Sequence, residues 1–280
     1  MTQYIINNKN HYIDSSSALA WLKISDELLF KSENYCKWKV NIITKSILLS
    51  KNKSINIIDL WGCYVLNIFV ILRFLVNQWY KINYFVLNIN QSSILITQKK
   101  IHKSFWTSVN FHGIQTDLEL ETFEFLESFT ENHLNLFLLF WWIFSELSNS
   151  FDIINCIKKN TKNRFEIFIE DDFWFSDNEI NEMVQYYYLD KVKKFFMSIF
   201  KVWIQDDYMK YKVDFNNNCL VVQVLITNNY YDQMLDVNLY KGDIIILFKK
   251  KYITCKELLS LYKNFKITFD SWLMIMWHYE

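Results

Sequence analysis

The sequence contains no proline and only three glycines among its 280 residues. Average usage of about 5% and 7% would give roughly 14 prolines and 20 glycines. Glycine supplies the left-handed backbone of many turns and proline fixes others, so different residues must form the turns here. Tryptophan is abundant, with 11 residues. We interpret the chain as an ordinary sequence whose turn residues were replaced, by engineering or by loss of selection on function.

Clustered cysteines and an excess of one charge are also absent. The five cysteines are scattered without a CxxC spacing, which predicts reduced thiols and a cytoplasmic location. The five histidines are equally dispersed, so no metal site is expected. Lys plus Arg and Asp plus Glu both number 30, so there is no overall field that favours nucleic acid or an acidic membrane.

Long hydrophobic runs are missing too. The longest unbroken apolar run, residues 136–144, is far shorter than the ~20 residues that span a bilayer. Residues 1–14 lack the apolar core of a signal peptide and are expected to be frayed. With 51% hydrophobic residues the chain can build a sizeable core. We therefore expect a soluble protein without membrane contact.

Residues 54–97 organise the rest of the sequence. An apolar strand, residues 55–60, carries Asp59 and leads through a corner, residues 61–64, into an apolar helical run, residues 65–76. A second strand, residues 84–89, carries Asn88. Such a βαβ unit builds a parallel sheet with a right-handed crossover. Ligands of these sheets bind beyond the carboxyl ends of the strands, which points to residues 59–65 and 88–91.

Periodicity predicts the remaining elements. Two helices are expected within residues 15–50, either as a cofactor lid or as a packing layer. Further strands are expected at 109–114, 134–140, 164–170, 219–227 and 243–248, with 134–140 central in the sheet. Helices are expected at 91–105 with Ser92 and Ser93 as caps, and at 118–129, 151–159, 177–200 and 254–262. Residues 266–269 and 273–277 should form a closing hairpin.

The corner and the second strand resemble two motifs of class I S-adenosylmethionine (SAM) methyltransferases. DLWGCYVLN is similar to an acid followed by Gly-x-Gly-x-Gly, with Asp59 on the acid and Trp61, Cys63 and Val65 on the glycines. VLNINQSS is similar to the strand whose acid binds the ribose, with Asn88 on that acid. The resemblance implies a cofactor site that contains the residues Asp59, Trp61, Gly62, Cys63, Asn88, Ile89, Asp117, Leu118, Phe140 and Trp141.

Asp117 has two interpretations. In the methyltransferase frame it meets the adenine amine, and as a local feature it caps the expected helix 118–129. Both roles can coexist. The two tryptophans after the fourth strand, Trp141 and Trp142, either fill the cofactor pocket or stack against a ligand.

The histidine-specific Nα-methyltransferases are the branch that the sequence resembles most. LYKGDIIILFKKKYIT is similar to their motif F-x-x-G-E-x-I-x-T-E-x-S-x-K-Y-T, with Gly242 and Asp243 in register. Phe248 and Lys250 then occupy the places of the residues that bind the amino acid. Tyr186 and Tyr187 either line an aromatic cage for an ammonium group through cation–π contact or pack as ordinary core and surface tyrosines.

These observations predict an α/β fold: a Rossmann-like, seven-stranded SAM-methyltransferase sheet with helices on both faces and a smaller α+β insertion. The expected parts are a helical cap (1–50), the cofactor core (51–171), the insertion (172–240) and the end of the core (241–280). The implied function is methyl transfer from SAM to a small-molecule amine, such as that of an amino acid. Positioning supplies most of such catalysis, which suits a sequence without a triad or metal motif.

Two other functions share features of this sequence. A non-catalytic scaffold that keeps the fold is supported by the replaced glycines, because bulky residues at left-handed positions are strained. A nucleotide-binding oxidoreductase would share the βαβ start but is disfavoured by the closing hairpin.

Overall fold

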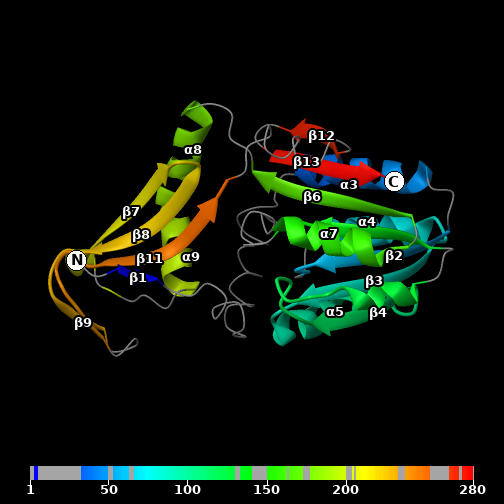
Figure 1. The fold of residues 1–280 in the computed structure, drawn as a ribbon, viewed down its shortest axis with the longest axis horizontal. Coiled ribbons are helices and arrows are strands. Elements are labelled where there is room, and N and C mark those ends of the chain that lie inside the picture. Colours follow the sequence, from blue (N-terminus) through cyan, green and yellow to red (C-terminus); the bar gives the residue numbers. More distant parts are fainter. Residues whose placement is uncertain are drawn as a thin grey trace. The chain divides into compact units, whose positions relative to one another are not determined.

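The structure is a computed structural model that describes residues 3–5, 33–49, 53–62, 66–129, 133–140, 150–162, 164–172, 177–199, 204, 206–232, 237–252, 265–270 and 273–279. The chain divides into two compact units (Figure 1). The larger unit comprises Ile13–Asp172 and Leu259–Glu280, and the smaller comprises Met1–Tyr12 and Phe173–Leu258. Within the described ranges, no helix is both long and apolar enough to cross a membrane.

The larger unit is built on one sheet with the order β12-β13-β6-β5-β2-β3-β4. Its strands are β2 (Ser54–Leu60), β3 (Lys81–Asn88), β4 (Val109–Gln115), β5 (Leu134–Leu139), β6 (Phe165–Asp172), β12 (Phe265–Asp270) and β13 (Leu273–Tyr279). The five strands β6, β5, β2, β3 and β4 are parallel. β13 lies antiparallel to β6 and pairs with β12 in a hairpin. The predicted parallel core, the neighbouring places of β2 and β5, and the closing hairpin are confirmed.

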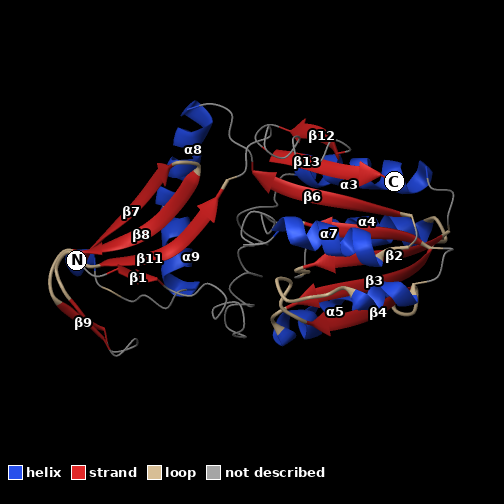
Figure 2. Ribbon diagram, in the orientation of Figure 1, coloured by secondary structure: helices blue, strands red, loops and turns tan. Residues whose placement is uncertain are grey.

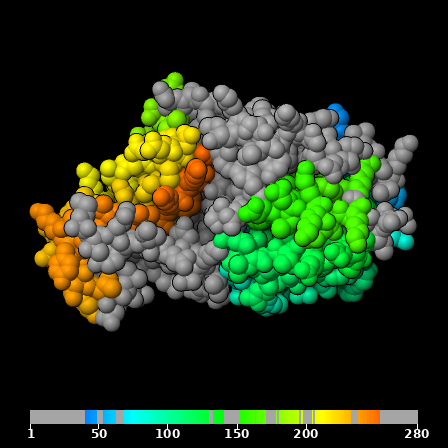
Figure 3. Space-filling view, viewed as in Figure 1, coloured from blue at the N-terminus to red at the C-terminus, as the bar shows by residue number. Residues whose placement is uncertain are grey.

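Helices cover both faces of this sheet (Figure 2). The helices are α3 (Glu33–Leu49), α4 (Leu66–Asn77), α5 (Gln91–Phe105), α7 (Ser150–Asn160) and the 3-10 helix η2 (Glu124–Ser128). α3, α4 and α5 share a core cluster with the side chains of one face, including Ile57, Tyr84 and Leu136. On the other face, Phe125 and Phe129 around η2 pack against Phe85. In Figure 3, green atoms that include those of α7 form part of the face of the larger unit that is turned to the viewer.

Two local predictions in this unit were wrong. The region expected as a helix at 118–129 contains a turn and then only the short η2, because Asp117 bonds to its own turn (see below). The cap of α5 is neither Ser92 nor Ser93 but Asn90, whose side chain accepts a hydrogen bond from the Ser93 N–H at 3.1 Å. Two helices were expected within residues 15–50; α3 is one, and residues 15–32 lie outside the described residues.

A row of asparagines crosses four parallel strands. Asn110 on β4 donates to Asn83 on β3 at 3.1 Å, and Asn83 donates to Asn56 on β2 at 2.8 Å. Asn56 in turn donates to Asn135 on β5 at 2.8 Å. The four residues are partners in the strand register, which places them side by side on one face. Asn56 is 2% exposed and Asn135 is fully buried. A buried amide without its hydrogen-bond partner is costly, so the bonds of this asparagine row favour one strand register.

A charged group is buried on the opposite face. Glu166 on β6 is fully buried and accepts a hydrogen bond from the Ser46 hydroxyl of α3. Arg164 Nη2 lies 3.6 Å from its carboxylate. Burial raises the pKa of Glu166, and the Ser46 hydrogen bond and the Arg164 charge lower it in part.

The smaller unit contains a four-stranded sheet of order β1-β11-β8-β7 and a short hairpin of β9 and β10. Its elements are β1 (Gln3–Ile5), α8 (Asp177–Tyr188), α9 (Asp190–Ile199), η3 (Asp206–Tyr208), β7 (Met209–Asn216), β8 (Cys219–Ile226), β9 (Tyr230–Asp232), β10 (Val237–Leu239) and β11 (Ile244–Lys251).

The smaller unit departs from the sequence predictions at four points. The N-terminus is not frayed throughout, because β1 pairs parallel with β11. The helix expected at 177–200 is two helices with a break at Leu189. β7 was not predicted. β11, expected in the end of the core (241–280), instead pairs with β8 in the smaller sheet. The helix expected at 254–262 lies outside the described residues.

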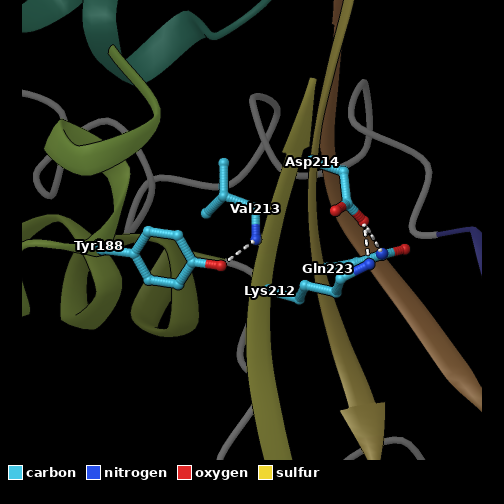
Figure 4. Close-up of polar contacts among 5 residues, drawn as sticks. All are labelled: Tyr188, Lys212, Val213, Asp214 and Gln223. Atoms are coloured by element: carbon cyan, nitrogen blue, oxygen red, sulfur yellow. Dashed lines mark hydrogen bonds and ion pairs between the residues drawn. The ribbon is translucent and has the colours of Figure 1, made fainter. Parts of the chain in front are cut away.

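The edge of this sheet at β7 is protected. The Tyr188 hydroxyl at the end of α8 accepts a hydrogen bond from the outward N–H of Val213 at 3.0 Å (Figure 4). On the adjoining strands, Lys212 Nζ and Gln223 Nε2 both reach Asp214 Oδ2, at 2.8 and 2.7 Å. Because the Val213 N–H is already bonded to Tyr188, it cannot pair with a further strand, and this limits edge-to-edge association of the sheet.

The asparagine row predicts a position-dependent cost. Asn56→Ala leaves Asn135 Oδ1 without its donor and Asn83 Nδ2 without its acceptor, so we expect a loss of about 2–4 kcal/mol in the free energy of unfolding. Asn110→Ala, at the exposed end, should cost less than about 1 kcal/mol. Urea denaturation with unchanged m-values measures both. Equal effects of the two substitutions would contradict a buried row.

Glu166 predicts a pH dependence of stability. Its pKa is raised in the folded state, so the native protein binds this proton more tightly than the unfolded chain does. The free energy of unfolding should fall as pH rises from the unfolded pKa of 4.5 through the raised folded value. Glu166→Gln keeps an acceptor for Ser46 and should flatten this fall, so that the variant gains stability relative to the parent at pH 8 but not at pH 4.5. Urea unfolding of both proteins at these two pH values provides the comparison, and an equal difference at both would refute it.

Candidate cofactor site

The corner after β2 combines a strained tryptophan with a tightly enclosed glycine. Trp61 has a φ of 80°, and its N–H donates to the Leu87 carbonyl oxygen at 2.7 Å. A left-handed conformation at a residue with a Cβ costs about 1–2 kcal/mol. A Cβ added to Gly62 would lie 2.8 Å from both Asp59 Oδ2 and Val86 Cγ1. Gly62 must therefore be a glycine because its neighbours leave no room for a side chain. The positive φ lies one residue earlier, at Trp61.

Asp59 is buried beside this corner. Its Oδ2 accepts a hydrogen bond from the Tyr84 hydroxyl of β3 at 2.8 Å. Asp59 pairs in register with Val86 on one side and Leu138 on the other, which places it at the point where the strand order reverses. Open α/β sheets bind ligands beyond the strand ends at this switch point. Sequence reasoning missed Tyr84; the only sign of its role is its apolar-face position in β3.

Asn88 connects the end of β3 to the same corner. Its Nδ2 donates to the Trp61 carbonyl oxygen at 3.3 Å and to the Gly62 carbonyl oxygen at 3.2 Å. Its Oδ1 accepts from the Asn90 N–H at 2.7 Å. The side chain is 3% exposed. Asn88 therefore uses both ends of its amide to hold two strand ends together.

The other predicted cofactor residues lie at the same edge. The Thr116 N–H donates to the Asn88 carbonyl oxygen at 3.1 Å, which ties the end of β4 to β3. Asp117 follows, half-buried, and its Oδ1 accepts from the Glu119 N–H at 3.1 Å, so it forms a turn rather than capping a helix. Ile89 is half-buried, and Leu118 and Phe140 are buried. Cys63 and Trp141 lie outside the described residues.

The four predicted substrate residues belong to the smaller unit. The ring of Tyr187 lies 5.6 Å from that of Phe196 and 6.2 Å from that of Phe248, between centroids. Tyr186 meets Tyr187 edge-on at 5.6 Å. Lys250 is buried with its Nζ 4.7 Å from the centre of the Tyr252 ring. The contacts of Tyr187 and Phe248 pack α8 and α9 on the sheet. The binding role of all four residues stays a prediction.

No family model matches the chain. No curated protein matches it. The solved structure of magnesium protoporphyrin IX methyltransferase from Synechocystis PCC 6803 with bound SAH is similar, with a TM-score of 0.50, 8% identity, and coverage of 98% of this chain and 100% of that one. A SAM-dependent methyltransferase from Anabaena variabilis ATCC 29413 has a TM-score of 0.50, 9% identity, and coverage of 97% and 94%.

The chain has the class I methyltransferase fold. At such low identity the likeness concerns the fold alone. The resemblance to the histidine-specific branch stays a prediction. In this fold, the switch-point edge of the sheet carries Asp59, Gly62 and Asn88. Among the residues with described positions, no three His, Cys, Asp or Glu side chains are grouped to hold a metal ion.

The Asn88 geometry sets an expectation for Asn88→Asp. The sequence resemblance suggests that an acid here tightens SAM, because a hydrogen bond to a charged group contributes about 1.5–3 kcal/mol against about 1 for a neutral one. In the free protein, however, the new carboxylate oxygen would face the carbonyl oxygens of Trp61 and Gly62 in place of a donor. We expect Asn88→Asp to lose about 1–3 kcal/mol of stability at pH 7 and to recover part of it at acid pH, where the group is protonated. Thermal unfolding at pH 7 and pH 4 measures this. A variant as stable as the parent at pH 7 would contradict a stabilising role for the hydrogen bonds from Asn88 to the corner.

Proposed function

We propose that the chain is a SAM-dependent methyltransferase that acts on an amine, such as the amine of an amino acid. The cofactor lies along the carboxyl ends of β2, β3 and β4. One observation carries the proposal: Asp59 and Asn88 are buried at the ends of two neighbouring parallel strands, and both adjoin the corner that turns into α4. The fold supports it, because the similar methyltransferase from Synechocystis was solved with SAH.

The proposed roles follow from the position of each residue along this edge. The backbone of the corner at Trp61 and Gly62 faces the amino-acid end of SAM, Asn88 bonds to the ribose hydroxyls, and Asp117 meets the adenine amine. Ile89, Leu118 and Phe140 supply apolar contact. An amine needs only to lose a proton and to lie in line with the sulfonium methyl, so positioning supplies most of the rate.

For the substrate, the proposal draws on the tyrosine pair of α8. Tyr187, Phe248 and Lys250 are buried in the smaller unit, whereas Tyr186 is half-buried. Of the four, Tyr186 is therefore the candidate for contact with a cationic amine, through the face of its ring.

A second candidate function, a non-catalytic scaffold with the same fold, is favoured by the bonds of Asn88. Its amide donors already serve Trp61 O and Gly62 O, and its acceptor serves the Asn90 N–H. A ribose must displace these bonds before Asn88 can bind it. With Trp61 in a strained corner as well, SAM affinity is expected to be weak.

Restoration of the glycine motif separates the two functions. The triple replacement Trp61→Gly, Cys63→Gly and Val65→Gly restores the three glycines of the motif and relieves the left-handed strain at Trp61. We expect a gain in SAM affinity of well over tenfold, which corresponds to about 1.4 kcal/mol. Calorimetric titration of the parent and the variant with SAM measures this.

The control is Trp61→Phe, which keeps a bulky ring at the left-handed position and should gain nothing. Transfer of a labelled methyl group to a panel of free amino acids then tests the activity. A folded triple variant with no gain in SAM affinity would contradict the cofactor site, and micromolar binding by the parent would contradict the obstructing role of Trp61.

A further inference from the structure

Two tryptophans occupy equivalent places at the amino-terminal edge of the large sheet. Ile82 of β3 and Val109 of β4 are register partners, and Trp79 and Trp106 each lie three residues before them. Each tryptophan ends a helix: the Trp79 N–H donates to Val76 O and the Trp106 N–H to His102 O, both at 3.0 Å. Neighbouring strands lie about 4.8 Å apart, so the two turns are close.

These tryptophans are strained without any gain from burial. Trp79 has a φ of 60° and Trp106 a φ of 49°, both in the positive range that residues with a Cβ rarely adopt. Their side chains are 89% and 80% exposed, so packing against the protein does not offset the backbone cost. Strain that folding does not explain is a reason to look for a function. Trp79 and Trp106, here called the tryptophan platform, offer two exposed indole rings just before neighbouring strands, where flat ligands could stack on them.

Positive charge surrounds this platform. Lys81 at the start of β3 and Lys103 in the last turn of α5 are both exposed, and neither has an ion-pair partner among the residues that the structure describes. Lys53 Nζ lies close by, 3.2 Å from Gln78 O and 4.4 Å from the centre of the Tyr80 ring. Between residues 51 and 116 the only acid is Asp59, which is buried. The overall net charge of zero therefore conceals a local basic region.

We propose that this edge binds single-stranded nucleic acid. Successive bases stack on Trp79 and Trp106, and Lys81 and Lys103 contact the phosphates. Base–aromatic stacking combined with a basic track is the usual chemistry of single-strand binding without sequence preference. A membrane surface fits less well, because the tryptophans sit on two short turns and not along the apolar face of an amphipathic helix. The proposed methyl-transfer site lies at the other end of the same strands, so the two proposals stand or fall separately.

The test uses the full chain and a fluorescein-labelled 12-mer of oligo(dT), with binding followed by fluorescence anisotropy across a salt series. Trp79→Gly with Trp106→Gly should weaken binding by at least about 25-fold, since each stacked base contributes fivefold or more. The variant should remain folded, because glycine adopts left-handed φ without cost. Trp79→Tyr with Trp106→Tyr should keep most of the affinity, since tyrosine also stacks.

Charge variants supply the second readout. Lys81→Gln with Lys103→Gln should reduce the steepness of log affinity against log salt by about 1.4, at about 0.7 for each phosphate contact. The matched pair Lys210→Gln with Lys241→Gln, exposed in the smaller unit, should leave the slope unchanged. Absence of oligo(dT) binding, equal binding of duplex DNA, or an unaffected glycine variant would overturn the proposal. So would tryptophan-dependent binding to phosphatidylserine vesicles without oligonucleotide binding.

Discussion

The side-chain amide of Asn88 holds together the part of the molecule on which the proposed cofactor site depends. It joins the carboxyl end of β3 to the corner after β2 through two carbonyl oxygens, and it holds its own following residue in place. The corner needs this support, because Trp61 has a left-handed backbone and Gly62 fits only without a side chain. The same bonds compete with a cofactor, so one interaction both stabilises the corner and limits binding.

The shortage of glycine has a visible structural consequence. Trp61, Trp79 and Trp106 all have a positive φ at turns where glycine would be free of strain. Trp61 lies at the carboxyl ends of the strands, where the cofactor is proposed to bind. Trp79 and Trp106 lie at the amino-terminal ends of β3 and β4. The asparagine row across β4, β3, β2 and β5 contributes directional bonds that fix the register of the same sheet. The fold is thus maintained with few of the usual turn residues.

Much of the fold could be predicted from the sequence, because buried parallel strands are continuous apolar runs and the closing hairpin has its own pattern. Other features required coordinates. β1 is three residues long and pairs with β11, far along the chain, which leaves no local signal. β7 alternates buried and exposed residues as a strand with one face in the core does, so its sequence carries a local strand signal. The helix expected after Asp117 was replaced by a turn, because an aspartate can bond to its own backbone as readily as it caps a helix.

For the candidate site, the sequence identified the edge but not its bonding. The hydrogen bonds from Tyr84 to Asp59 and from Asn88 to the corner join segments that are distant in the chain, so the sequence gives no local sign of them. Hydrogen–deuterium exchange of the full chain with and without excess SAM tests the central claim most directly. The account predicts slower exchange in peptides that cover residues 59–62 and 88–91 when SAM binds. Protection by SAM that leaves these peptides unchanged and appears elsewhere would contradict the proposed site.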